Sequence, residues 1–477
     1  MSLNLDCWIH VLSFLDLKSK VRCERVSRTI RAAARIALSH QRSLTAGHDS
    51  DPTAEDDGGD PVPAALVNDI ARFYRLETLL SKCPNLSYVR VRTTSPQPPD
   101  DLIRLIISHC PHIESLHVSC PNVRVTWAGP VFEIQTKHVF QLMMDKLKRL
   151  KNLTLPFCST ERLKRLLSER RMHSVHFAVY DQPVTADHLQ AVTSDLVQFS
   201  GSLILSQCAV QKLISSCPKL RNLATGPMSN ETLSRIVFNF PFLERLSLTF
   251  DRSFSVETMS SLSHLTALRS LHLTANTFTH FDGTMHTILR DVGSTLTDLR
   301  LDGLFVTDLS LSFVSLLVPR LRRLSVRRSI FMPQVSVPGI TDDTFKSFAR
   351  FTCIKVIDLD VANSVSEAGV GYLFSHANSR DLRFVRVWDA TKPLISHQVL
   401  VAAGTYCKDR VPVKEAMHLM LDHQFRKNEE GSADEESARG QQLTVHEARL
   451  LLCRFRESRP TNLDLSVRLG SYCIIMK

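Results

Sequence analysis

The fold is decided by four segments that share one pattern: FPFLERLSL (240–248), LTALRSLHL (265–273), STLTDLRL (294–301) and VPRLRRLSV (318–326). Each segment ends with an apolar residue, two variable residues, an apolar residue, one variable residue and a last apolar residue. Leu248, Leu273, Leu301 and Val326 close these segments at intervals of 25, 28 and 25 residues. A pattern that recurs at such intervals predicts a solenoid, because one unit cannot bury its leucines without the next.

Six further segments have the same form: CPNLSYVRV (83–91), CPHIESLHV (110–118), LKRLKNLTL (147–155), CPKLRNLAT (217–225), FTCIKVIDL (351–359) and SRDLRFVRV (379–387). The alternation at the end of each predicts a strand with its apolar residues on one face. Helix-like segments lie between them, among them DDLIRLIISHC (100–110), ERLKRLLSE (161–169), NETLSRIVFNF (230–240) and TDDTFKSFARF (341–351). The segments at 174–179 and 202–205 are irregular, which leaves the register of the repeats open there.

This pattern resembles the leucine-rich-repeat family, in the cysteine-containing form common among F-box proteins. Three cysteines precede proline at equivalent places, Cys83, Cys110 and Cys217, where a helix must stop. The resemblance implies an α/β solenoid of horseshoe form, which we place at residues 65–402. The variable residues beside the strand leucines would then form its concave binding face.

The N-terminal segment LDCWIHVLSFL (5–15) predicts a helix that is apolar around most of its circumference. Its polar residues Asp6, His10 and Ser13 fall on one narrow strip, so the helix must be buried on more than one side. A unit of about 40 residues struggles to build a core of its own. A partner that completes the core and a simple cap on the solenoid are equally compatible with this pattern.

The same segment and the DLKSKVRCERVSR that follows resemble an F-box, whose usual form is LPxELxxxIFSxLDLxxLxRCxxVSxxW. Two positions depart from that form, since Asn4 replaces the usual proline and Ile30 replaces the usual tryptophan. The resemblance implies a small all-α F-box-like segment at residues 1–45 that binds a Skp-family adaptor. The residues to which this role is assigned are Leu3, Trp8, Val11, Leu12, Leu15, Leu17, Val21, Val26 and Ile30.

Two segments separate or close these domains. Residues 46–64 are acidic, rich in Pro and Gly, and predicted to be a disordered linker or a loop within the first repeat. After residue 402 the regularity is lost, so we expect an irregular C-terminal cap at 403–477 with a disordered loop at 427–442. A capping box at Thr444 and Glu447 predicts a helix after that loop, and the final residues predict a terminal strand.

The composition of the chain limits the classes of function that it can have. The 477 residues include 12 cysteines without a zinc-finger spacing, which favours a reducing compartment, cytoplasmic or nuclear. The net charge of +10 favours acidic partners. Nucleotide loops, metalloprotease and serine-hydrolase motifs are absent from the sequence, so we expect a non-catalytic protein without metal or cofactor. No apolar run reaches the length of a membrane span, and no membrane role is expected.

The predicted binding face is rich in arginine, whose planar guanidinium suits carboxylate or phosphate. The candidate substrate-binding residues are those projecting beside the strand leucines: Tyr88, Arg90, Arg92, Arg245, His272, Arg300, Arg323, Arg327, Arg386 and Trp388. Acids also lie on this face, namely Asp298, Asp302, Asp358 and Asp360. Arginine is nevertheless a common residue on any solvated strand face of a basic protein.

Three functions compete. The F-box resemblance implies a substrate receptor of an SCF-type cullin–RING ubiquitin ligase, which binds adaptor, cullin scaffold and a substrate protein, acidic or phosphorylated. The alternative is a leucine-rich-repeat scaffold or inhibitor with no ligase role. Nucleic-acid binding is the weakest, because basic and acidic residues are interleaved and no recognised module is present.

Overall fold

A computed structural model describes the protein. The described residues are 4–15, 17–46, 61–62, 70–92, 100–119, 131–155, 158–177, 183–201, 204–227, 229–250, 259–275, 282–303, 306–327, 340–361, 365–379, 381–389, 402–403, 406, 417–423, 463–469 and 472–476. They form two compact units, Met1–Thr225 and Gly226–Lys477.

The first unit begins with three helices, α1 (Leu5–Ser13), α2 (Leu17–Cys23) and α3 (Arg28–Ser39). Leu12, Ala33, Ala34 and Ala37 form their buried core. Trp8, Ile9, Leu15, Cys23 and Ile30 pack against it. The small alanine side chains of α3 leave room for Leu12 and the larger side chains of α1 to pack closely against this helix.

A parallel sheet follows directly from α3. Its strands are β1 (Ser43–Ala46), β2 (Pro61–Val62), β3 (Tyr88–Arg92), β4 (Ser115–Ser119), β5 (Asn152–Leu155), β6 (Ser174–Phe177), β7 (Gln198–Ser200) and β8 (Asn222–Pro227). β1 pairs with both β2 and β3, and each later strand pairs with the next, up to β8.

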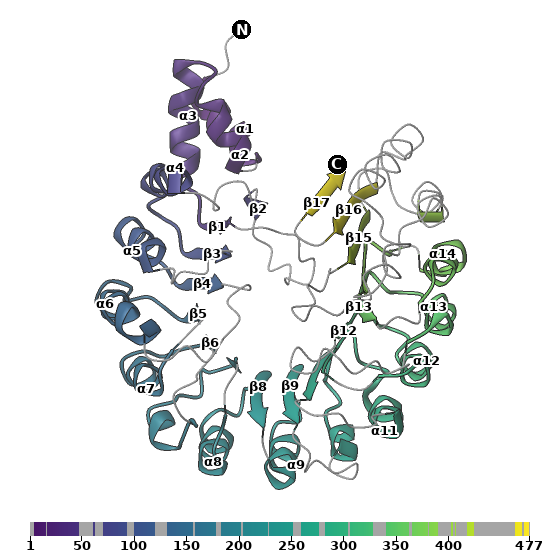
Figure 1. Cartoon of the computed structure of the whole chain (residues 1–477). Helices are drawn as coiled ribbons and strands as arrows, with labels where there is room; N and C mark the ends of the chain where they lie inside the picture. The colour runs from purple at the N-terminus through teal and green to yellow at the C-terminus, as the bar shows by residue number, and fades with distance from the viewer. Residues whose placement is uncertain are drawn as a thin grey trace, which may run out of the picture. The chain divides into compact units, whose positions relative to one another are not determined.

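Helices connect these strands along one face of the sheet (Figure 1). They are α4 (Ile70–Lys82), α5 (Asp100–His109), α6 (Val131–Lys146), α7 (Thr160–Glu169), the 3₁₀ turn η2 (Asp187–Leu189) and α8 (Gln207–Ser216). Between β6 and β7 the 3₁₀ turn η2 replaces a full helix, which makes this repeat irregular. Directly after β7, Gly201 has φ +133°, and a Cβ at this position would collide with the carbonyl oxygen of Phe177.

The second unit repeats the arrangement. Its strands are β9 (Arg245–Phe250), β10 (Ser270–Ala275), β11 (Asp298–Asp302), β12 (Arg323–Arg327), β13 (Val356–Val361), β14 (Phe384–Asp389), β15 (Met417–His423), β16 (Leu463–Leu469) and β17 (Tyr472–Met476). Parallel pairing runs in order from β9 to β16, and β17 pairs antiparallel with β16. The outer elements are α9 (Asn230–Asn239), η3 (Ser261–His264), α11 (Asp282–Val292), α12 (Asp308–Leu317), α13 (Asp342–Phe348) and α14 (Glu367–His376).

The sheet register confirms the predicted repeat. Leu248, Leu273, Leu301 and Val326 are paired strand by strand, so the sequence intervals become one row of the stack. All four side chains are buried. The α/β leucine-rich-repeat solenoid that the sequence predicts is therefore the observed fold.

The domain boundaries differ from those expected. Because β1 and β2 belong to the sheet, the solenoid starts at Ser43, and the acidic segment is inserted in the first repeat between these two strands. At the other end β15 and β16 extend the parallel sheet past residue 402. The acidic residues 47–60, the loop 427–442 and the helix expected after it lie outside the described residues.

Cysteine occupies a repeat position, as the sequence indicated. Cys110 Sγ lies 3.7 Å from the carbonyl oxygen of Cys83, and Cys217 Sγ lies 3.6 Å from that of Thr193. Burial raises the pKa of the Cys83, Cys110 and Cys217 thiols to about 11, 12 and 11. Protonated thiols donate to carbonyls of the preceding repeat, and their raised pKa makes them poor nucleophiles.

Candidate functional site

Two regions carry the candidate functional residues: the face of the sheet opposite the helices, and the three N-terminal helices α1 to α3. We call these three the F-box helices because they form the segment that resembles an F-box. The described helices leave that strand face uncovered in each unit (Figure 1). Tyr88, Arg90 and Arg92 lie on β3 in the first unit, with the Arg92 side chain outside the description. The other candidates lie in the second unit, on β9 (Arg245), β10 (His272), β11 (Arg300), β12 (Arg323, Arg327) and β14 (Arg386, Trp388). The side chain of Trp388 is also outside the described part.

In the second unit these residues form rows across the strands. The central row aligns Ser247, His272, Arg300, Ser325, Asp358 and Arg386. Alternation explains this, since leucine on either side of each position points to the buried face. The sheet therefore brings together residues that are up to 139 positions apart, from Ser247 to Arg386.

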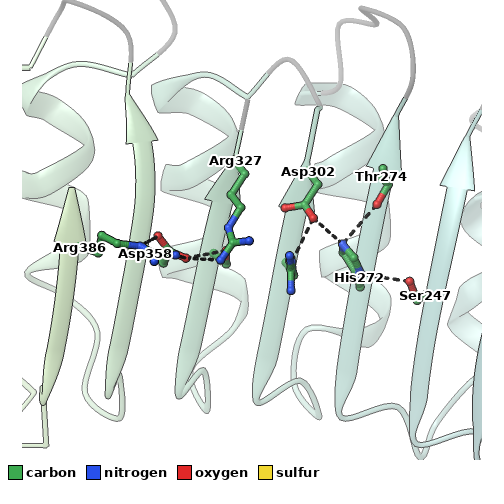
Figure 2. Close-up of polar contacts among 9 residues, drawn as sticks. Ser247, His272, Thr274, Asp302, Arg327, Asp358 and Arg386 are labelled. Carbon is green, nitrogen blue, oxygen red and sulfur yellow. Dashed lines mark hydrogen bonds and ion pairs between the residues drawn. The ribbon is translucent and has the colours of Figure 1, made fainter. Parts of the chain in front are cut away.

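One polar cluster surrounds Asp358 (Figure 2). Arg386 Nε donates to Asp358 Oδ1 at 2.6 Å, and its Nη2 also contacts Oδ2. Arg327 Nη2 donates to Oδ2 at 2.9 Å, and the Ser325 hydroxyl lies 3.4 Å from the same oxygen. The Asp358 side chain is 1% exposed and that of Arg386 is 12% exposed. Two arginines thus share one buried carboxylate, which holds both guanidinium groups in place.

A second cluster surrounds Asp302 (Figure 2). His272 Nε2 lies 2.9 Å and Arg300 Nε 3.0 Å from Asp302 Oδ2. The other nitrogen of His272, Nδ1, lies 3.0 Å from the Ser247 hydroxyl, and Thr274 Oγ1 lies 3.2 Å from Nε2. Burial alone would raise the pKa of Asp302, but the His272 hydrogen bond and nearby arginine charges outweigh it and lower the pKa. Asp302 is therefore an anion that orients its neighbours.

The order serine, histidine, aspartate in this cluster resembles a hydrolase triad. Asp302, however, also binds Arg300. Ser247, His272 and Asp302 lie on the strand surface, with no pocket around them among the described residues. A His272 ring that donates a hydrogen bond from Nε2 would accept a hydrogen bond from the Ser247 hydroxyl at Nδ1. Such chains of hydrogen bonds are the ordinary way in which neighbouring polar side chains find partners. We therefore assign this cluster a structural role, in which it holds the polar side chains of the strand face in place.

Arg323 also has an acidic neighbour. Its Nη1 donates to Asp298 Oδ2 at 3.0 Å, and both side chains are about a quarter exposed. Each described arginine of β11, β12 and β14 on this face therefore contacts an aspartate of the chain itself. The sequence placed acids among the arginines, but it did not reveal that they pair.

In the first unit the corresponding row contains Arg90, His117, Thr154 and His176. His117 Nδ1 lies 2.8 Å from Thr154 Oγ1, and the ring packs 5.2 Å from that of Tyr88. Burial, with the charge of Arg90, lowers the pKa of His117 to about 4. His117 was not selected from the sequence because a single histidine in a strand segment forms no catalytic or metal-binding motif.

We expect acid to destabilise the first unit through His117. Between pH 6.5 and 4 the unfolded chain binds a proton that the folded histidine rejects, so stability falls as pH decreases through this window. At pH 5 the loss should be about 1 to 2 kcal/mol relative to pH 7. Urea unfolding at both values should show a shallower pH dependence for His117→Gln than for wild type. The exposed His112→Gln serves as control, and equal pH dependence in all three proteins would contradict the assignment.

The F-box helices sort the predicted adaptor-binding residues into two groups. Leu12 and Leu17 are buried, while Trp8, Leu15, Val21 and Ile30 are half-buried. Val11 and Val26 are 46% and 67% exposed. Leu3 lies outside the described residues. Most of the predicted residues thus build the domain, and two are available to a partner.

Part of the exposed side of α1 is apolar, beside the polar strip of Asp6, His10 and Ser13. Cys7, Val11 and Phe14 are four and three residues apart, so they share one side of the helix, and we name them the α1 outer face. Phe14 is 77% exposed, and its ring lies 5.0 Å from the ring of His10. The sequence indicated a helix that is apolar except for one narrow polar strip, but it could not show which apolar side the short domain would leave uncovered.

The two departures from the usual F-box form have structural roles. Asn4 is the N-cap of α1, where its side chain accepts a hydrogen bond from the Cys7 amide at 2.8 Å. Ile30 packs against the core formed by α1 and α3. Both substitutions therefore support the helical domain.

The three helices are attached firmly to the first repeats. Lys82 of α4 forms an ion pair with Glu24, and Asn85 donates to the carbonyl oxygen of Ser39 at 2.9 Å. The carbonyl oxygen of Arg42 accepts from the amides of Ser87 and Tyr88. Sheet pairing of β1 with β3 completes the connection. The orientation of the helices is therefore fixed relative to β3 and α4.

Among the residues that the structure describes, no three His, Cys, Asp or Glu side chains converge as metal ligands would. Within the same part of the chain, the helices are too short or too polar to cross a bilayer.

Comparison with known proteins agrees with these observations. Residues 1–41 match the F-box domain family. The chain therefore combines an F-box match at residues 1–41 with a leucine-rich-repeat solenoid of parallel strands and outer helices.

Similarity to individual proteins is distant. The chain is similar to Rad7 in the crystal structure of the Rad7 and Elc1 complex in yeast, with 15% identity over 67% of this chain and 83% of that chain. The TM-score is 0.43, too low to transfer any property. No curated protein sequence matches the chain.

Proposed function

We propose that this chain is the substrate-binding subunit of an SCF-type ubiquitin ligase. Its F-box would bind a Skp-family adaptor, and through it a cullin, while the strand faces bind a substrate protein. The observation that carries this proposal is the α1 outer face, an apolar surface left exposed on a matched F-box domain. Exposed apolar residues gathered on one helix are typical of a protein interface.

The chain would contribute to ubiquitin transfer by proximity. The F-box is held against β3 and α4 by the contacts of Glu24 and Arg42, so a substrate on the first repeats would be presented at a fixed orientation. A rigid connection raises the effective concentration of substrate lysines near the ubiquitin donor. Other subunits would supply the catalytic groups.

The test is adaptor recovery by a Val11→Asp/Phe14→Asp variant. Both side chains are exposed, so the substitutions should leave the fold intact and abolish binding, because carboxylates cannot be buried without a partner. The full chain would be used to capture purified Skp-family adaptor and cullin, with wild type recovering both. Thermal unfolding would check that the variant remains folded.

The matched control is Leu309→Asp/Leu316→Asp. These two leucines are 54% and 57% exposed on α12 of the second unit and carry the same chemistry. Their replacement should leave adaptor recovery unchanged. If folded wild type captures neither adaptor nor cullin, the ligase role is abandoned and a scaffold or inhibitor role replaces it.

A further inference from the structure

A row of arginines lies on the F-box. Arg28, Arg31 and Arg35 of α3 are three and four residues apart, so they lie on one side of the helix within about 60° of arc. Arg25, in the turn before α3, is also exposed, as are the other three. We name these four residues the F-box basic face.

Within the described part of the chain this face has no acidic counterpart. Arg31 Nε donates to the carbonyl oxygen of Glu24 at 2.8 Å, while the Glu24 carboxylate is paired with Lys82. No ion pair is formed by Arg25, Arg28 or Arg35 with any described residue. Like charges at these helix spacings repel one another, so the fold gains nothing from placing them together.

The strand face makes the contrast clear. There Arg323 and Arg386, like Arg300, each contact an aspartate of the chain. The strand face therefore mixes both charges, whereas no described acidic side chain pairs with Arg25, Arg28 or Arg35 on the F-box basic face. A one-sign surface raises the local concentration of oppositely charged partners.

The basic face adjoins an apolar anchor. Val26, which is 67% exposed, lies between Arg25 and Arg28 in the turn that leads into α3. Protein interfaces commonly have an apolar centre with a charged rim. Phosphate backbones of nucleic acid need no apolar contact of this kind.

We propose that the protein bound at the F-box carries an acidic rim that meets the F-box basic face. This inference rests on the proposed function, because it describes the chemistry of the same partner. The arginines would accelerate encounter by electrostatic steering, and the apolar residues would determine how long the complex lasts.

The test compares association rates of the full chain with purified Skp-family adaptor at about 50 mM and about 500 mM salt. The variant Arg25→Gln/Arg28→Gln/Arg35→Gln removes three charges and spares Arg31, whose guanidinium binds the backbone. Its association rate should fall about tenfold at low salt and approach that of wild type at high salt. Its dissociation rate should change less than about twofold.

The charge-matched control is Lys148→Gln/Arg149→Gln/Arg171→Gln, which removes the same charge from exposed positions around α6 and α7. This control should bind like wild type. A wild-type association rate independent of salt, or an equal loss in both triple variants, would overturn the inference while leaving the ligase proposal intact. Failure of wild type to bind adaptor at all would overturn both.

Nucleic acid provides the remaining comparison. A short DNA duplex at about 150 mM salt should not bind wild type. Duplex binding that the Arg25, Arg28 and Arg35 variant loses would assign the basic face to nucleic acid and overturn the acidic-protein assignment.

Discussion

Asp358→Ala should lower the free energy of unfolding of the second unit by about 3 to 5 kcal/mol. The substitution leaves the guanidinium groups of Arg327 and Arg386 without the buried carboxylate that neutralises them. Arg386 contacts both carboxylate oxygens and is only 12% exposed, so water cannot easily replace its partner. Arg327 is 33% exposed, so water can partly replace the lost carboxylate and its share of the destabilisation should be smaller. Chemical denaturation of the full chain would measure the loss, and amide exchange in β12, β13 and β14 would localise it.

The physical reason can be separated from simple loss of volume. Replacing Asp358 by leucine together with Arg327 and Arg386 by methionine removes all charges and fills the space. That variant should recover most of the lost stability, since a buried ion pair seldom exceeds a well-packed apolar group in net stabilisation. If the single and triple variants are equally unstable, packing and not charge explains the effect.

Asp298→Ala is the matched control on the same face. Its pair with Arg323 is about a quarter exposed on both sides, and such pairs stabilise by at most about 1 kcal/mol. A loss of similar size from Asp298→Ala and Asp358→Ala would contradict the importance of burial.

The repeats could be predicted from sequence because the leucine spacing is itself the register of the sheet. Leu273, for example, pairs with Leu248 and Leu301, as their intervals require. The start could not be predicted, because β1 is separated from its neighbour β3 by a long insertion. At the end, the terminal strand expected in the final residues is present as β16 and β17, but β15 was missed because it lacks the preceding part of the pattern. Pairing across such distances leaves no periodic signal.

The candidate site was predicted as a face, but its chemistry was not. Strand alternation identified Arg327 and Arg386 as outward residues. Their shared contact with Asp358 joins three strands and depends on side-chain direction, which a linear pattern does not contain. The same limit applies to α1, where the exposure of Phe14 follows from which side α3 covers.

A second acidic residue, Asp308, connects one repeat to the next. It begins α12, and its carboxylate accepts from the Thr341 amide at 2.8 Å and the Thr341 hydroxyl at 2.6 Å. The Thr344 hydroxyl contacts it as well. Thr341 is the N-cap of α13, so Asp308 fixes the start of the neighbouring helix.

The same connection recurs along the unit. Asp282 accepts from the Thr307 hydroxyl at 2.7 Å, and Asp342 accepts from the Ser366 amide at 2.7 Å and from its hydroxyl at 2.5 Å. Thr307 and Ser366 are the N-caps of α12 and α14. Each acid therefore satisfies groups at the next helix start that would otherwise lack partners.

We expect Asp308→Ala to lower the free energy of unfolding by about 2 to 4 kcal/mol, since it removes three charge-assisted hydrogen bonds from partly buried donors. Asp308→Asn should retain part of the stability because its oxygen still accepts. Denaturant unfolding would give the magnitude, and amide exchange should become faster first at the beginning of α13.

The neighbouring Asp343→Ala serves as control, because that side chain is 71% exposed and contacts only Lys346 among the described side chains. It should change stability little.

The double variant Asp308→Ala/Asp342→Ala distinguishes a local cap from a link between repeats. If each acid acts only on the one helix start that it fixes, the two losses add. If stacking is coupled from repeat to repeat, the double variant should lose less than the sum, because the first substitution has already weakened α13, on which Asp342 lies. A strictly additive result would therefore reduce this feature to separate helix caps, whereas a shortfall would make it part of the cooperativity of the solenoid.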